Sequence, residues 1–63
     1  MYKAQLNEII NSLNEALVEA EKFDAGNDAA GRRLRAACQE AKTNLQTLRV
    51  EVQTERNARK DNK

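Results

Sequence analysis

The sequence predicts an all-α fold in which two long helices lie side by side as an antiparallel hairpin. Three observations support this prediction. The 63-residue chain is rich in helix-favouring residues and contains no proline and only two aromatic residues. Only one short stretch, residues 24–28, interrupts the helical pattern. On both sides of it, apolar residues recur at alternating spacings of four and three, as they do along one face of a helix.

The interruption at residues 24–28 has the residue types that end one helix and begin another. Gly26 can adopt the left-handed conformation that often follows a helix C-terminus. Asn27 or Asp28 can then cap the first turn of the next helix. We therefore expect helices over about residues 2–24 and 28–60, in a single helical-hairpin domain, 1–63, whose residues 61–63 form a frayed tail.

Each predicted helix carries one apolar seam. The seam of the first helix consists of Tyr2, Leu6, Ile9, Leu13, Ala16, Ala20 and Phe23, flanked by Ile10 and Leu17. The seam of the second consists of Gly31, Leu34, Cys38, Ala41, Leu45, Leu48 and Val52, flanked by Ala30 and Ala37. A fold at the interruption pairs the two seams in one register, from Tyr2 opposite Val52 to Phe23 opposite Gly31. The second helix then extends beyond the first by roughly nine residues.

A hairpin of this size leaves apolar surface uncovered. A chain of about 60 residues hides only about 60% of its unfolded surface. With one cysteine and no histidine, neither an internal disulfide nor a metal site is expected to supplement the core. We therefore expect self-association into a homodimeric four-helix bundle or coiled coil, or a tetramer. The residues predicted to form the core and the oligomer interface are Leu6, Ile9, Ile10, Leu13, Leu17, Leu34, Cys38, Leu45 and Leu48.

Charge is divided unevenly behind a net charge of +1. Residues 1–31 contain two Lys and six acidic residues, a net charge of −4, whereas residues 32–63 contain nine Lys or Arg and four acidic residues, a net charge of +5. Cations recur every seventh residue in the second half, which places them along one side of a helix, about 10 Å apart. The residues predicted to contact nucleic-acid phosphates are Arg32, Arg33, Arg35, Lys42, Arg49 and Arg56.

A cationic row of this kind has a second interpretation. Basic residues often flank the core of an antiparallel coiled coil and pair there with glutamates, for which Glu15, Glu19 and Glu21 are candidates. The segment Gly31–Arg35 favours phosphate binding, because three arginines within four positions offer bidentate donors. The sequence alone leaves both interpretations of the cationic row open, phosphate binding and pairing with glutamates beside a coiled-coil core.

Several function classes are not supported by the residues. Cys38 falls on the apolar seam and the chain has no histidine, so no nucleophile and base are paired and we expect no enzyme, cofactor or small-molecule substrate. The longest apolar runs, such as Ala16–Val18, are too short for a membrane span or a signal sequence. We expect a soluble, intracellular protein of the cytoplasm or nucleoid that does not bind membranes.

The residues around the interruption resemble those of the bacterial histone H1-like proteins. The shared pattern runs from Phe23-Asp24-x-Gly26-Asn27-x-Ala29-Ala30-Gly31-x-Arg33-x-Arg35-x-Ala37 to Gln39-Glu40-x-Lys42, within a resemblance that spans about Leu13 to Arg59. The resemblance implies sequence-independent DNA binding and compaction by a nucleoid-associated protein, with Arg33, Arg35, Lys42 and Arg49 as its basic positions. Double-stranded DNA, bound at its phosphate backbone, is therefore the expected partner besides the protein itself.

Two other classes are compatible with the same helices. An oligomeric coiled-coil module could bind only copies of itself or another protein, using the acidic first helix and the basic second helix. A membrane-surface helix is less favoured, because the apolar face already has a partner and no tryptophan is present. A steep salt dependence of binding to arbitrary duplexes distinguishes DNA binding from the protein-interaction module.

Overall fold

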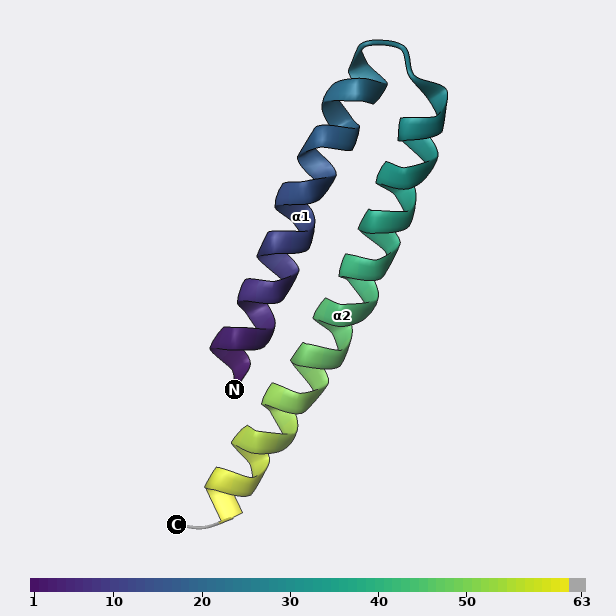
Figure 1. Cartoon of the computed structure of the whole chain (residues 1–63). Helices are drawn as coiled ribbons and strands as arrows, with labels where there is room; N and C mark the ends of the chain where they lie inside the picture. Colours follow the sequence, from purple (N-terminus) through teal and green to yellow (C-terminus); the bar gives the residue numbers. More distant parts are fainter. Residues whose placement is uncertain (62–63) are drawn as a thin grey trace.

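The computed structural model describes residues 1–61 and shows a hairpin of two α-helices (Figure 1). Helix α1 runs from Tyr2 to Asp24 and helix α2 from Asp28 to Asp61. The helices are antiparallel, and α2 continues well past the beginning of α1 (Figure 1). The predicted all-α hairpin is confirmed. Asp61, which the sequence predicts to lie in the tail, is the last helical residue, and residues 62 and 63 of the predicted tail lie outside the described residues.

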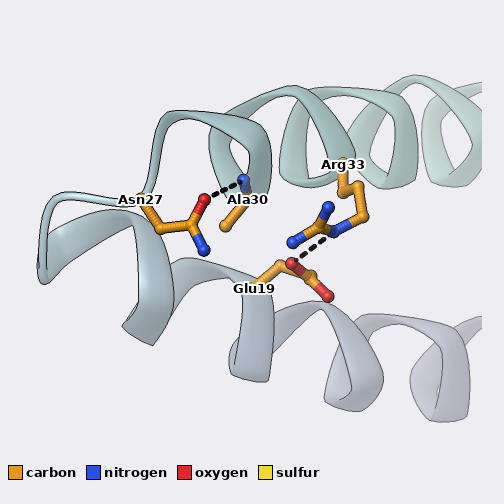
Figure 2. A network of polar contacts seen from close by, with 4 residues as sticks. All are labelled: Glu19, Asn27, Ala30 and Arg33. Carbon is orange, nitrogen blue, oxygen red and sulfur yellow. Dashed lines mark hydrogen bonds and ion pairs between the residues drawn. The ribbon is translucent and has the colours of Figure 1, made fainter.

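The connection between the helices follows the predicted chemistry. Gly26 has a φ of 104°, a left-handed conformation that glycine adopts without steric cost. The amides of Gly26 and Asn27 donate to the carbonyl oxygens of Phe23 and Lys22 at 2.9 and 3.0 Å, the paired bonds of a Schellman motif. Asn27 then accepts a hydrogen bond through Oδ1 from the amide of Ala30 at 3.1 Å (Figure 2). The residue that caps α2 is therefore Asn27 and not Asp28.

Replacing Asn27 with alanine is expected to lower the free energy of unfolding by about 1 kcal/mol, because the first turn of α2 loses its side-chain acceptor. For a domain of this size, the melting temperature should fall by roughly 4–8 °C at fixed protein concentration. Asn14→Ala is the control, since Asn14 is exposed in the middle of α1. Circular dichroism melts that fall equally for both variants would contradict the capping role.

Small side chains bring the two helices together. The buried apolar residues are Ile9, Ala16, Ala30 and Ala41, and Ala30 is fully inaccessible. Next to the turn, a Cβ built on Gly31 would come within 2.5 Å of the Phe23 ring, so the glycine leaves space for that ring. This contact confirms the predicted pairing of Phe23 with Gly31. Near the other end of the hairpin, the Tyr2 hydroxyl donates to the carbonyl oxygen of Glu51 at 3.4 Å.

The contact faces share alternate residues with the predicted seams, namely Ile9, Ala16, Leu34, Ala41 and Leu48, whereas the contacts between these positions are shifted by about one residue. In α1, Gln5 is half-buried and Leu6 is exposed. In α2, Ala37 is half-buried while Cys38 is exposed, so the predicted burial of Cys38 is wrong for the single hairpin. Of the predicted core and interface residues, Ile9 is buried, Leu34 and Leu48 are half-buried, and the exposed ones are Leu6, Ile10, Leu13, Leu17, Cys38 and Leu45.

The alanines explain why alternate contact positions are shifted by about one residue. Close approach of two helices requires small residues at the line of contact, and Ala16, Ala30 and Ala41 supply them. The larger side chains then lie beside that line instead of on it. As a result, one side of the hairpin carries an apolar face, which consists of Leu6, Ile10, Leu13 and Leu17 of α1 and Cys38, Leu45 and Val52 of α2.

Candidate nucleic-acid interface

The side of the hairpin opposite the apolar face is a polar groove between the two helices. Residues of both helices line it, and its charged members are mostly acidic. The carboxylates of the groove are those of Glu8, Glu15, Glu19, Glu40 and Glu51. Arg33 is the cation among the residues that line it. A phosphate backbone approaching this side would be repelled.

Arg33 lies in the polar groove and not beside the other predicted phosphate-binding residues. Its Nε donates to Oε2 of Glu19 at 2.8 Å, as Figure 2 shows. The Arg33 side chain is 52% exposed, so this ion pair stabilises the hairpin by only about 0–1 kcal/mol. Because several carboxylates surround it, however, Arg33 is poorly placed to meet a polyanion. The sequence spacing contains a signal for this separation, because Arg33 is two residues from Arg35 and residues two apart do not face the same side of a helix.

Four cations of α2 form the basic row, which we define as Arg35, Lys42, Arg49 and Arg56. All four are exposed, and their sevenfold spacing aligns them along one side of the helix, about 10.5 Å apart. The ion pairs within the described part of the chain are Arg33–Glu19 and Arg59–Glu55, and neither includes a member of the row.

The basic row borders the apolar face. Arg35 lines a shallow hollow with Leu34 and Cys38 on the surface of α2. Further along α2, Arg49 lines a similar hollow with Leu45 and other apolar residues. The row and the acidic groove therefore lie on different sides of α2, and the net charge of +1 conceals a two-sided distribution.

The remaining predicted cation, Arg32, is close to one end of this row. It is exposed and lines the same shallow hollow as Arg35. Two further cations, Arg59 and Lys60, lie in the last turn of α2, where Arg59 pairs with Glu55 at 3.5 Å. These two cations are not among the residues that the sequence predicts to bind nucleic acid, although they lie near the end of the basic second half of the chain.

Residues 1–61 carry neither a metal-binding cluster nor a membrane-spanning segment. No group of three or more Cys, Asp or Glu side chains there is arranged to hold a metal ion. Within the same residues, neither helix contains an apolar stretch long enough to cross a membrane. The most distinctive features of this part of the chain are therefore surfaces: the basic row, the acidic groove and the apolar face.

This fold and these surfaces define a small helical-hairpin protein with a segregated charge distribution. A family model described as histone H1-like protein Hc1 matches residues 3–58. Because the match covers nearly the whole chain, the protein belongs to the histone H1-like Hc1 family. The predicted family resemblance is confirmed. No curated protein and no solved structure matches the chain. Membership of this family points to a non-enzymatic, DNA-associated nucleoid protein.

Proposed function

We propose that this protein binds double-stranded DNA without reading its sequence and acts as an architectural, DNA-compacting protein of the nucleoid. The basic row carries the proposal, because its four exposed cations lie outside the ion pairs found among the described residues. Arg32 extends the same basic surface at one end. Arg33 contributes less than its place in the sequence implies, since Glu19 and the acidic groove surround it.

The chemistry of the row explains why binding would not depend on sequence. Arginine and lysine contact phosphate oxygens, which are the same at every base pair, and such contacts position a protein without specifying a site. The guanidinium groups of Arg35, Arg49 and Arg56 can each donate two parallel hydrogen bonds to one phosphate. The acidic groove repels DNA from the opposite side, so the duplex would approach one edge of the hairpin only.

Self-association completes the proposed function. Four phosphate contacts from one hairpin give weak binding at physiological salt, because each contact contributes only about 0.9 to the salt slope. Two linked hairpins would double the number of contacts and gain avidity. A homo-oligomer can also hold separate parts of a duplex, which is the physical basis of compaction.

The test is fluorescence anisotropy with duplexes of unrelated sequence across a salt series. We expect affinities that agree within about threefold between sequences and a slope of log affinity against log salt of about −3.6 or steeper, the value for four or more phosphate contacts. An absence of binding at low salt would contradict the proposal. A marked preference for one duplex would contradict its sequence independence.

An oligomeric protein-interaction module is the second candidate. The observation that favours it is the large apolar face, together with a net charge of only +1. In that case the hairpin would self-associate or bind a protein partner, and DNA would not bind even at low salt. The same anisotropy series therefore distinguishes the two functions when sedimentation is measured beside it.

A further inference from the structure

The apolar residues that α1 leaves exposed form a second seam along that helix. Leu6, Ile10, Leu13 and Leu17 are 43%, 45%, 40% and 60% exposed. Their spacings of four, three and four place them on one side of α1, next to but not on its contact with α2. Single exposed apolar side chains are common on protein surfaces, but a continuous row of four large aliphatic side chains indicates an interface.

The surface area of the hairpin also indicates a missing partner. A compact monomer of 7.1 kDa is expected to expose about 4,100 Å². This hairpin exposes 5278 Å², roughly 1,200 Å² more than the expected value. Stable protein interfaces bury about 800 Å² on each partner. The excess is therefore enough for one interface with a second copy.

The second seam is self-complementary. Its spacings of four, three and four read the same in both directions along the helix. An antiparallel copy of α1 therefore presents an identical seam, in which Leu6 meets Leu17 of the partner subunit and Ile10 meets Leu13 of the partner subunit. Such mutual contacts are the requirement for an interface with two-fold symmetry.

Helix α2 does not offer an equivalent seam. Its exposed apolar residues on this side, Cys38, Leu45 and Val52, are seven residues apart. The intervening positions on the outer edge of the face are occupied by Lys42 and Arg49 of the basic row. Only every second position along this side of α2 is therefore apolar, so contact between two copies should centre on α1.

We propose that two copies of this protein pair through α1, antiparallel, with the two-fold axis running between the two α1 helices at the level midway between Ile10 and Leu13. This inference deepens the proposed function by naming the partner, the face and the orientation of the homo-oligomer. The two α2 helices then lie along the same edge of a four-helix bundle, and their basic rows lie side by side. Both acidic grooves face outward, away from that edge.

The arrangement links pairing to DNA binding. Two basic rows on one edge repel each other in the absence of a polyanion, and a phosphate backbone along that edge removes the repulsion. The duplex would thus strengthen pairing, and pairing would by the same factor strengthen binding of the duplex.

Cysteine cross-linking without DNA tests this pairing, using variants that carry Cys38→Ser to remove the native thiol. After mild oxidation, an equimolar mixture of Leu6→Cys and Leu17→Cys should yield at least fivefold more covalent dimer than either variant alone, because each residue 6 meets residue 17 of the other copy. Val18→Cys mixed with Leu6→Cys is the matched control, since Val18 is exposed but lies off the seam. It should give no more dimer than the single variants.

Two outcomes would overturn the proposal. Leu6→Cys alone forming as much dimer as the mixture would show a parallel pairing. A mixture that forms no more dimer than the Val18 control, together with a monomeric wild-type chain in sedimentation equilibrium, would show that α1 is not an interface. Because DNA is absent from both measurements, their failure is distinct from a failure of DNA binding in the anisotropy series.

Discussion

Replacing Arg35, Lys42 and Arg49 with glutamine is expected to weaken binding to duplex DNA by about two orders of magnitude at 0.1 M salt. Each phosphate contact contributes about 0.9 to the salt slope, so the loss of three contacts per hairpin should reduce that slope by about 2.7. The three residues are exposed and belong to neither ion pair among residues 1–61, so their replacement should leave the hairpin folded. Fluorescence anisotropy across a salt series measures both quantities.

The matched control replaces Lys3, Lys22 and Arg33 with glutamine. Both triple variants remove three cations and change the net charge from +1 to −2. The control residues lie outside the basic row, and Arg33 is already paired with Glu19, so we expect an affinity loss below about threefold. Equal losses in the two variants would mean that overall charge, and not the basic row, determines DNA binding.

Replacing Ala30 with leucine is expected to cause a large loss of stability. Ala30 is fully buried at the contact between the helices, and its amide donates the capping hydrogen bond to Oδ1 of Asn27. The added methylenes have no space to occupy and would force the helices apart, at a cost of about 1–3 kcal/mol. This is a large share of the stability of such a small domain, so the melting temperature should fall by roughly 8–16 °C for a loss of about 2 kcal/mol.

Ala36→Leu is the control for this substitution. Ala36 is also in α2 but is exposed, and leucine and alanine both favour helices. Its melting temperature should stay within about 4 °C of the wild-type value, since surface substitutions usually change stability by less than about 0.5 kcal/mol. Thermal melts followed by circular dichroism at one protein concentration compare the two variants. A similar melting temperature for Ala30→Leu and Ala36→Leu would contradict the close packing at Ala30.

The hairpin and its turn were predictable because their causes are local. A glycine that can adopt positive φ, followed at once by an asparagine that can cap a helix, specifies where one helix ends and the next begins. Gly26 and Asn27 occupy the expected positions in the structure. The pairing of Phe23 with Gly31 was also predictable, because both residues are adjacent to that turn.

The exact contact face was not predictable from periodicity. Three adjacent apolar rows run along α1, one containing Ile9 and Ala16, the next Leu6 and Leu13, and the third Ile10 and Leu17. The spacing of the residues does not specify which two of these rows face α2. The choice depends on how closely the backbones approach, and the buried alanines at positions 16, 30 and 41 favour a closer approach than leucines would allow. The separation of Arg33 from the basic row does not depend on the contact face, because residues two apart do not face the same side of a helix; the contact face decides only that its partner is Glu19.

The position of the turn has a consequence for how the chain folds. Contacts near Gly26, such as that of Phe23 with Gly31, close loops of only a few residues, whereas the contact of Tyr2 with Glu51 closes nearly the whole chain. Loop closure costs more entropy as the loop lengthens, so the two helices should associate first beside the turn and then zip progressively toward the chain ends. A topology of this kind belongs to the fast-folding class of helical proteins. The segment of α1 near Tyr2 would then dock last and be the first to open.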